Sequence, residues 1–389
     1  MKMCRRTGVI IAGVMLALSL PTAEAGEIPS VIELGAPGPA FNLVGVDDRM
    51  HTLDGFKDAK LLVLVFTCNH CPDALGAVER LQTFHDEYKE KGVQLVAISG
   101  NDPLAIEPWE VGWSVHGDSF PEMKLHAKEF GWTFPYLYDG DTQETVRGYG
   151  GQATPHAFVL DADRKVRYQG AFDNGGRSTG PASENHVRDA VDALLADREV
   201  AVPQTRARGC STKWSFKRDK VATKDAAYKK LPVIMELLDE ATAQSLKENK
   251  TDKIRVINLW STTCPPCIVE LPHFADAQRR YEHRKVEIVT ISTDPDDLHD
   301  KAEDLLKKIH TPVVATLNPS LVAEGRTTNN YRIPDEAFET IADILAPDWS
   351  GALPLTLILD RGGRLALEHL GSMDAVELRR AILKVINGR

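Results

Sequence analysis

Two pairs of closely spaced cysteines are the residues of this sequence best suited to chemistry. The first pair, Cys68 and Cys71, lies in FTCNHCPDALG with His70 between them. The second pair, Cys264 and Cys267, lies in LWSTTCPPCIVELP. Each pair follows an apolar run and precedes a helical pattern, which predicts a helix N-terminus where N–H groups and the helix dipole stabilise a thiolate. We therefore expect redox exchange, in which the first cysteine is the exposed nucleophile and the second resolves the mixed disulfide.

A close cysteine pair has two other roles, as a structural disulfide that pins a turn and as part of a metal site. Zinc needs four ligands, and no further Cys/His cluster follows at zinc-finger spacing. Cys68, His70 and Cys71 could hold a thiophilic ion, so a copper(I) chaperone is an alternative. We expect no metal, and no cofactor beyond redox-active Cys68–Cys71 and Cys264–Cys267 disulfides. A flavin or nicotinamide is not expected, because neither half has a Gly-rich nucleotide fingerprint after its first strand.

Apolar runs and helical patterns alternate in the same order in both halves of the chain. Pro155 follows Cys68 at almost the same distance as Pro354 follows Cys264. This repetition predicts two α/β units of one plan, with largely parallel strands and helices around them. The expected strands are 61–66, 93–99, 156–161, 165–172, 254–260, 286–292, 355–360 and one near 365–371, and the expected helices are 72–91, 185–198, 233–250 and 375–386.

Length, charge and the N-terminus limit the class of protein. A chain of 389 residues has room for two domains, and a net charge of -10 argues against nucleic-acid binding. Residues 1–25 have a basic start, a short apolar run and an Ala-Glu-Ala ending at Ala25, which is the layout of a cleavable secretory signal. The run is too short for a membrane span, and Cys4 lies in the basic region, which argues against a lipoprotein anchor. We expect a periplasmic or secreted protein without a transmembrane segment after cleavage.

Cys210, in RARGCSTKW, is the cysteine left over from the two pairs. It could be a third redox thiol that captures Cys68 or Cys71, a buried free cysteine, or half of an intermolecular bridge. The sequence leaves these roles open.

The second half resembles the thioredoxin-like thiol–disulfide oxidoreductases of the TlpA/ResA type through NLWSTTCPPCIVELP. The resemblance implies a thioredoxin fold, a nucleophilic Cys264 and a resolving Cys267. It also implies that Glu270 is an acid near the cysteines that helps to move the proton when Cys267 is ionised. The helical pattern at 233–250 departs from the hairpin with which this family usually begins.

The first half resembles redoxin and AhpC/TSA-like thioredoxin family proteins with a CNHCP motif, from LGAPGPAFNL to the GCSTKW tail. These proteins are similar in fold to peroxiredoxins, whose signature is Pro-x-x-x-Thr-x-x-Cys. With Cys68 as that cysteine, Leu61 and Val65 stand at the proline and threonine positions. A thiol peroxidase using Cys68 is therefore an alternative that ranks below disulfide exchange.

Both resemblances imply that a substrate binds at the loop proline of each half. Pro155 and Pro354 match the loop proline that is cis in thioredoxin folds, where the backbone pairs with the substrate. Thr154 and Leu353 precede these prolines and would shape the docking surfaces.

His70 distinguishes the first pair from the second. It could donate a hydrogen bond to the Cys68 thiolate, which would stabilise the reduced form and make this disulfide the more oxidising of the two. The first half has no counterpart of Glu270, because Ala74 is the third residue after Cys71.

Together these observations predict an exported enzyme that exchanges dithiols and disulfides. Its fold class is α/β, with two tandem thioredoxin-like folds, each a central mixed β-sheet flanked by helices. We expect a signal at 1–25 and domains at 27–215 and 230–389, with the boundary in the charged stretch 213–230. The expected partners are protein thiols and disulfides and a membrane-bound or soluble thiol donor, and the sequence leaves open whether the domains exchange electrons.

Overall fold

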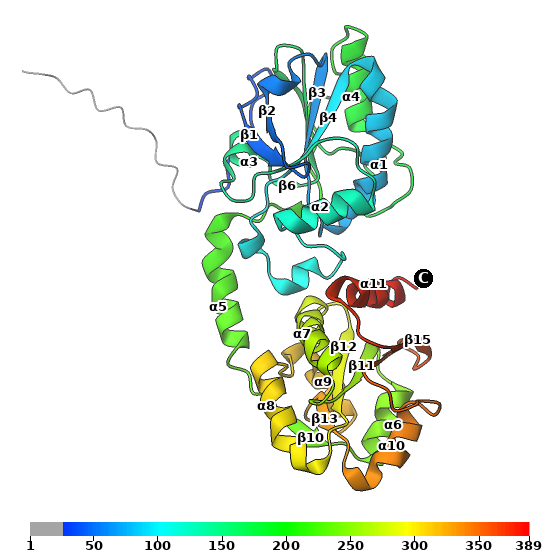
Figure 1. Cartoon of the computed structure of the whole chain (residues 1–389). Helices are drawn as coiled ribbons and strands as arrows, with labels where there is room; N and C mark the ends of the chain where they lie inside the picture. The colour runs from blue at the N-terminus through cyan, green and yellow to red at the C-terminus, as the bar shows by residue number, and fades with distance from the viewer. Residues whose placement is uncertain (1–25, 389) are drawn as a thin grey trace, which may run out of the picture.

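The computed structural model describes residues 26–388, and the expected signal at residues 1–25 lies outside this range. The described chain forms two units, each built around one central sheet, and helix α5 (Arg218–Tyr228) runs alongside from the first to the second (Figure 1). None of the helices in residues 26–388 combines the length and the apolar composition needed to cross a bilayer.

The sheet of the first unit has the order β2-β1-β5-β4-β3-β7-β8. Strand β3 leads into the first cysteine pair and pairs parallel with β4 and antiparallel with β7. Strand β5 continues the parallel side, and β8 continues the antiparallel side. The strands are β1 (Asn42–Gly45), β2 (Met50–Thr52), β3 (Leu61–Phe66), β4 (Val93–Ser99), β5 (Tyr136–Tyr138), β7 (His156–Leu160) and β8 (Val166–Gly170).

The sheet of the second unit repeats this arrangement, with the order β10-β13-β12-β11-β14-β15. Strand β11 leads into the second cysteine pair, with β12 and β13 on its parallel side and β14 and β15 on its antiparallel side. Both units therefore share a mixed five-stranded core of thioredoxin-like topology. The strands are β10 (Met235–Leu237), β11 (Ile254–Trp260), β12 (Val286–Ser292), β13 (Asn330–Arg332), β14 (Leu355–Leu359) and β15 (Leu365–Leu370).

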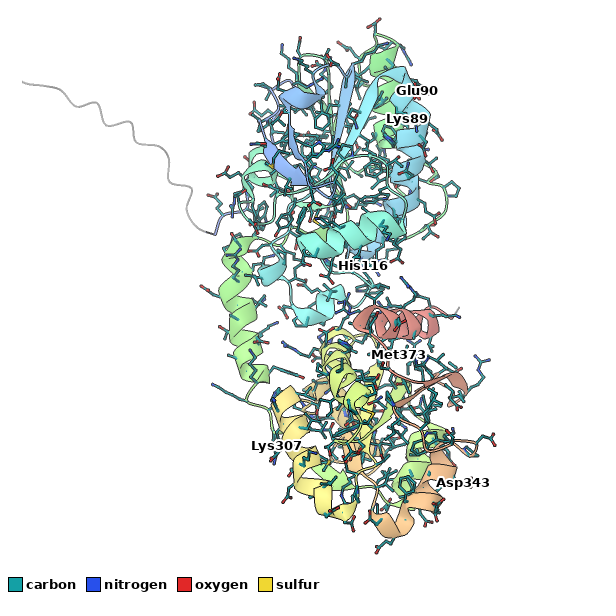
Figure 2. The ribbon with its side chains drawn as sticks, viewed as in Figure 1. Lys89, Glu90, His116, Lys307, Asp343 and Met373 are labelled. Atoms are coloured by element: carbon teal, nitrogen blue, oxygen red, sulfur yellow. A yellow bond between two sulfur atoms is a disulfide. The ribbon has the colours of Figure 1, made fainter. Side chains whose placement is uncertain are left out.

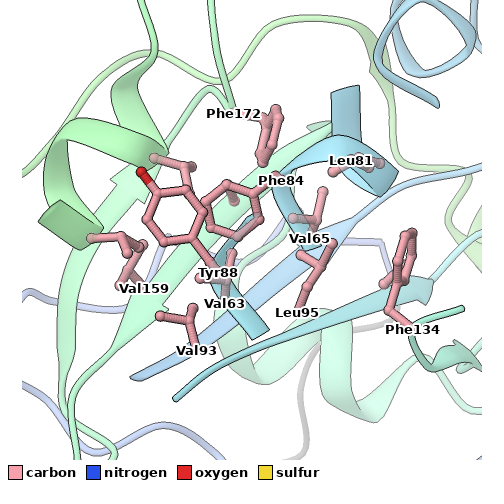
Figure 3. Close-up of a cluster of buried hydrophobic side chains, with 14 of the residues drawn as sticks. Val63, Val65, Leu81, Phe84, Tyr88, Val93, Leu95, Phe134, Val159 and Phe172 are labelled. Atoms are coloured by element: carbon pink, nitrogen blue, oxygen red, sulfur yellow. The ribbon is translucent and has the colours of Figure 1, made fainter. Parts of the chain in front are cut away.

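Each central strand is buried on both faces, and its alternating side chains enter two different cores. In β3, Val63 and Val65 pack with Leu81 and Phe84 of the following helix, as Figure 3 shows, whereas Leu64 faces the opposite core. The sheets are thereby sandwiched between helices and fixed in register. The helices are α1 (Pro72–Tyr88), α2 (Phe120–Glu129), α3 (Glu144–Tyr149), α4 (His186–Leu195), α6 (Glu240–Glu248), α7 (Pro265–Arg280), α8 (His299–Ile309), α9 (Asn318–Ala323), α10 (Phe338–Leu345) and α11 (Ala375–Ile386).

One expected helix is wrong in part. Residues 233–250 begin with strand β10, and α6 starts only at Glu240. Asp239 caps this helix, since its side chain accepts a hydrogen bond from Thr242 N at 2.7 Å. The charged stretch 213–230, where no regular pattern was expected, contains α5.

The two units meet where the C-terminal end of α7 and helix α11 contact α2 and the loop that precedes it. Arg280 donates to Ser114 O at 2.6 Å, and Arg284 donates to Gly112 O at 2.9 Å. Arg380 of α11 forms an ion pair with Glu129 at 3.1 Å. Figure 2 labels His116 on the side of the first unit that faces α11.

His126 should make the fold sensitive to acid. It is fully buried on α2 among aromatic rings, and burial lowers its pKa to about 3. Between pH 6.5 and 3 the unfolded chain therefore binds a proton that the folded chain does not, and stability is lost as the pH falls. We expect His126 to lower the free energy of unfolding by roughly 2 kcal/mol between pH 6.5 and 5.

Denaturant unfolding at pH 6.5 and at pH 5 measures this slope, the change in the free energy of unfolding with pH. His126→Phe should reduce this slope. Equal slopes in the wild type and His126→Phe would contradict this assignment.

Candidate active site

The second cysteine pair lies where β11 ends and α7 begins. A disulfide joins Cys264 and Cys267. Cys264 is the N-cap of α7, and its Sγ accepts a hydrogen bond from Cys267 N at 3.3 Å. Cys264 is half-buried and Cys267 is fully buried, so Cys264 is the sulfur of this pair that solvent reaches.

Glu270 lies one helical turn after Cys267, on the same side of α7. Its carboxyl is buried and accepts hydrogen bonds from Asn258 Nδ2 at 2.8 Å and Met373 N at 2.9 Å. Burial raises the pKa of Glu270. A carboxyl with a raised pKa can hold and release a proton closer to neutral pH, as proton transfer to a nearby thiolate requires.

Both prolines that the family resemblance singles out follow cis peptide bonds, at Thr154–Pro155 and Leu353–Pro354, as predicted. In the second unit, Leu353 and Cys264 pack against the same apolar cluster, which contains the buried Cys267. The cis-proline loop and the disulfide are thus next to each other.

The first cysteine pair is placed differently against its helix. Helix α1 begins at Pro72, so the second cysteine, Cys71, is the N-cap, whereas α7 begins directly after the first cysteine of its pair. Cys68 is only 1% exposed and Cys71 is completely buried. The prediction of an exposed Cys68 at the helix N-terminus is therefore wrong, because the helix starts three residues later than that arrangement needs.

The surroundings of Cys68 and Cys71 shift the pKa values of these two thiols in opposite directions. Hydrogen bonds from the Cys210 and Cys68 thiols, together with the Ala74 N–H of α1, lower the pKa of Cys71. Burial raises the pKa of Cys68, and the negative charge of Asp118 adds to this effect. The first site therefore favours a thiolate at Cys71.

Thr154 holds both thiols of the first pair next to the cis proline. When both cysteines are protonated, the Cys68 thiol donates to Thr154 Oγ1 at 3.2 Å, and the Cys71 thiol donates to Thr154 O at 3.1 Å. Cys210 N donates to Cys71 Sγ at 3.2 Å, which brings the leftover cysteine into the same site.

His70 does not make the expected hydrogen bond to Cys68. Its Nδ1 pairs with Asp118 Oδ2 at 2.8 Å, and within residues 26–388 its buried Nε2 has no hydrogen-bond partner. His70 is only 1% exposed, which argues against the substrate-binding role expected for it. Burial disfavours its charged form, but the Asp118 carboxylate outweighs this and raises the pKa of His70. The predicted reason for a more oxidising first disulfide, a hydrogen bond from His70 to the Cys68 thiolate, is therefore absent.

Asp118 is the site residue that sequence reasoning missed. Its carboxylate also accepts from Asn69 N at 2.9 Å and from Asn101 Nδ2 at 2.7 Å. Burial would raise its pKa, but His70 and these donors lower it. Asp118 lies in HGDSF, far from the cysteines in sequence, and no spacing or motif connects it to them.

The ligand atoms of Cys68, His70 and Asp118 lie within 4.8 Å of one another, which is close enough to share a metal ion. The set expected for copper(I) contained Cys71 in place of Asp118. A carboxylate is a hard ligand that suits zinc better than copper(I). Because Asp118 already accepts three hydrogen bonds, little of its capacity is free for an ion.

Asp118→Asn should weaken the first site by removing the countercharge of His70. The part of the stability due to His70 is fully present below pH 6.5 and is lost as the pH rises through its raised pKa. The part due to Asp118 is present above pH 3.8 and is lost as the pH falls through its lowered pKa. We expect a loss of about 3 kcal/mol near pH 5.5, because a buried pair is broken.

Denaturant unfolding at pH 5.5 and 8.5, with NMR titration of the His70 ring, checks this. The variant should lower the pKa of His70 and lose less stability at pH 8.5. Asp73→Asn, which removes a half-buried acid of α1 whose Oδ2 lies 3.6 Å from Arg177 Nε, serves as the control. An unshifted His70 titration would contradict the assignment.

Two family models match the chain, one in each half. Residues 33–185 match Redoxin, and residues 228–367 match the AhpC/TSA family. A curated relative, the thiol-disulfide oxidoreductase ResA of Oceanobacillus iheyensis, is 35% identical over 68 residues. The match spans 18% of this chain and 34% of the relative, so about a third of the relative's length is covered.

Solved structures of similar proteins cover about half of the chain. An uncharacterized conserved protein from Geobacillus kaustophilus is 35% identical, covering 49% of this chain and 94% of that chain at a TM-score of 0.42. A hypothetical protein from Sinorhizobium meliloti is 32% identical, covering 48% and 97% at a TM-score of 0.43. A putative thiol:disulfide interchange protein from Chlorobium tepidum is 20% identical, covering 43% and 99% at a TM-score of 0.33. With the repeated five-stranded core and the two family matches, the chain is a tandem thioredoxin-like protein.

Proposed function

We propose that this protein is a thiol–disulfide oxidoreductase with two redox centres. The observation that carries the proposal is the disulfide of the second unit, which joins the half-buried Cys264 to the buried Cys267 at a helix N-terminus, next to cis Pro354. A disulfide with one accessible sulfur at such a position suits exchange with a partner thiol. The relative named as a thiol-disulfide oxidoreductase supports the same activity.

The reaction at the second centre follows from this geometry. A partner thiolate attacks Cys264 Sγ, the bond to Cys267 breaks, and Cys267 leaves as a thiolate. Glu270, with its raised pKa, supplies the proton that neutralises Cys267. A second partner thiol then displaces Cys264, so that the partner is oxidised to a disulfide and both cysteines are reduced; the reverse sequence reduces a partner disulfide.

The surface around the second centre fits a polypeptide partner. Ile268 and Val269 follow Cys267 on α7 and are 38% and 70% exposed. Apolar side chains at a redox site offer a docking surface to another protein. We further propose that the protein acts outside the cytoplasm on protein thiols and disulfides, with electrons from a thiol donor, because residues 1–25 have the layout of a secretory signal.

The two centres act on separate partners in this proposal. The C-terminal end of α7, through Arg280, contacts the first unit, whereas Cys264 lies at the opposite end of this 16-residue helix. The helix is about 24 Å long, and exchange requires the sulfurs to touch. This distance supports independent centres over a direct relay between the domains.

A thiol peroxidase is the second candidate. The sequence suggests Cys68 as its reactive cysteine, whereas the match of residues 228–367 to the AhpC/TSA family covers the second unit and favours Cys264. A peroxidase would oxidise its reactive cysteine with hydrogen peroxide orders of magnitude faster than a free thiol. Stopped-flow oxidation of the reduced protein no faster than that of free cysteine would exclude it.

Reduction of insulin disulfides with dithiothreitol as the electron source tests the proposed activity. Cys264→Ser/Cys267→Ser should lose about 100-fold or more of the protein-dependent rate, because it removes the accessible centre. Cys68→Ser/Cys71→Ser should keep most of it, because its cysteines are buried. A wild-type rate equal to that of dithiothreitol alone would overturn the proposal, and a loss caused only by the first-site variant would overturn the assignment of the accessible centre.

Glu270→Gln should slow exchange at the second centre without removing the disulfide. The amide keeps the shape of the side chain but cannot transfer a proton, so we expect a loss of about 100-fold in the insulin rate at pH 7. The pH profile should also lose the ionisation due to Glu270. Glu282→Gln, which changes an acid just beyond the opposite end of α7, serves as the control. An unchanged rate and profile would remove Glu270 from the mechanism.

A further inference from the structure

The edge beside Pro155 is already occupied by the chain itself. Strand β6 (Ala153–Thr154), which directly precedes the cis proline, pairs antiparallel with β9 (Cys210–Ser211), and the register sets Thr154 opposite Cys210. An extended segment that adds to an exposed strand is a common mode of peptide binding. The strand that carries Cys210 therefore takes the position of a bound peptide at the first site.

Gly209 allows this strand to approach so closely. Its φ is +125°, a conformation that other residues rarely adopt, and a Cβ at this position would overlap the carbonyl oxygen of Thr154. The second unit has no strand paired with its cis-proline loop among the described residues. The pairing of β9 with the strand before the cis proline is thus specific to the first unit.

The docked strand holds three thiols together. Cys68, Cys71 and Ala74 form one buried cluster, and Cys210 packs against it. Cys210 N donates to Cys71 Sγ at 3.2 Å, and Thr154 Oγ1 donates to Cys210 O at 3.4 Å. Cys68 and Cys71 are almost completely buried, whereas Cys210 is half-buried. Cys210 is therefore the thiol of this cluster that a partner protein can reach.

We propose that Cys210 is the partner-facing sulfur of the first site and that it forms a disulfide with the buried Cys71. The proposal rests on the proposed thiol–disulfide activity and names the partner class of this site as a protein thiol that approaches along β9. A disulfide between Cys68 and Cys71 is then buried, and it exchanges with partner thiols only through Cys210.

Three exchange steps describe this site once a disulfide joins Cys68 and Cys71, and none of them needs a further oxidant. In the first, Cys210 attacks Cys71 of a Cys68–Cys71 disulfide; the Cys71–Cys210 bond forms, Cys68 is released, and the proton of Cys210 passes to Cys68. In the second, a partner thiolate attacks Cys210 Sγ, Cys71 leaves as a thiolate, and a mixed disulfide joins the partner to Cys210. A second partner thiol then releases Cys210, which takes up that thiol's proton, and the partner becomes a disulfide.

The interactions of the Cys71 sulfur support the second step, in which Cys71 leaves. In the reduced site, hydrogen bonds from Cys210 and Cys68 lower the pKa of Cys71. In the second step Cys210 has no S–H to donate, but the Cys68 thiol and the backbone N–H groups of Ala74 and Cys210 still stabilise a Cys71 thiolate. A thiol of lower pKa is the better leaving group. Attack at Cys210 with departure of Cys71 is therefore the favoured cleavage of their disulfide.

Disulfide mapping tests the proposal in the full-length protein with Cys264→Ser and Cys267→Ser, so that the first site is examined alone. Cys68→Ser is added, the protein is equilibrated with oxidised glutathione, and disulfides are mapped by mass spectrometry after alkylation and non-reducing digestion. We expect linked peptides that contain Cys71 and Cys210. The matched control with Cys210→Ser should leave Cys71 without a glutathione adduct, because Cys71 is completely buried.

Reduced glutathione is then added to the linked form and the first adduct is trapped. Glutathione on Cys210 should exceed glutathione on Cys71 by about tenfold, because Cys71 is the better leaving group and is buried. Separate adducts without a link, or first attack at Cys71, would overturn the proposal. If Cys68→Ser does not fold, the same mapping with Cys68 retained must show both the Cys68–Cys71 and the Cys71–Cys210 links.

The outcome can be separated from that of the insulin assay. A Cys71–Cys210 link in a protein that does not reduce insulin would support the inference and not the proposed function. Insulin reduction without this link would support the proposed function and overturn the inference.

Discussion

The residue at which the helix begins after each cysteine pair determines much of the chemistry of the two sites. Helix α1 begins after Cys71, and helix α7 begins after Cys264. The N-cap sulfur lies nearest the free N–H groups and the positive end of the dipole, where a thiolate is most stable. A difference of one cysteine in the start of the helix thus moves the stabilised sulfur from the first position of the pair to the second. Two units with the same five-stranded core are thereby given different reactive sulfurs.

Access to solvent separates the sites further. In the second unit the N-cap sulfur is half-buried, and exposed apolar residues of α7 lie beside it. In the first unit the N-cap sulfur is completely buried under the β9 strand and its neighbours, so the stabilised thiolate is not the one that a partner meets. Burial without partners would raise the pKa of this thiol; the hydrogen bonds from Cys210 and Cys68 and from backbone N–H groups reverse that effect. The strand that restricts access is also what stabilises the thiolate.

The long strands and helices could be predicted because their pattern is local. The strand at 61–66 is a continuous apolar run and the helix at 72–91 has apolar residues at helical spacing, and both lie where expected. The cis bonds at Pro155 and Pro354 followed from resemblance to a family and not from periodicity. Strand β10, at three residues, is too short to show an alternating pattern, and the helical signal of α6 extended over it. The contacts of Asp118 with His70 and of Cys210 with Cys71 depend on tertiary folding, so no local rule could reveal them.

The loop before α2 connects the first site to the second unit. Asp118 stands at one end of this loop and binds His70 and Asn69 beside the buried cysteines. A few residues earlier, Gly112 O and Ser114 O accept hydrogen bonds from Arg284 and Arg280 of the second unit. Val115 of the same loop packs against the core of the second unit. Ordering a loop costs about 1–2 kcal/mol per residue, and contacts at both ends share that cost. The second unit therefore helps to hold the carboxylate that the first site needs, even though its own disulfide lies at the far end of α7.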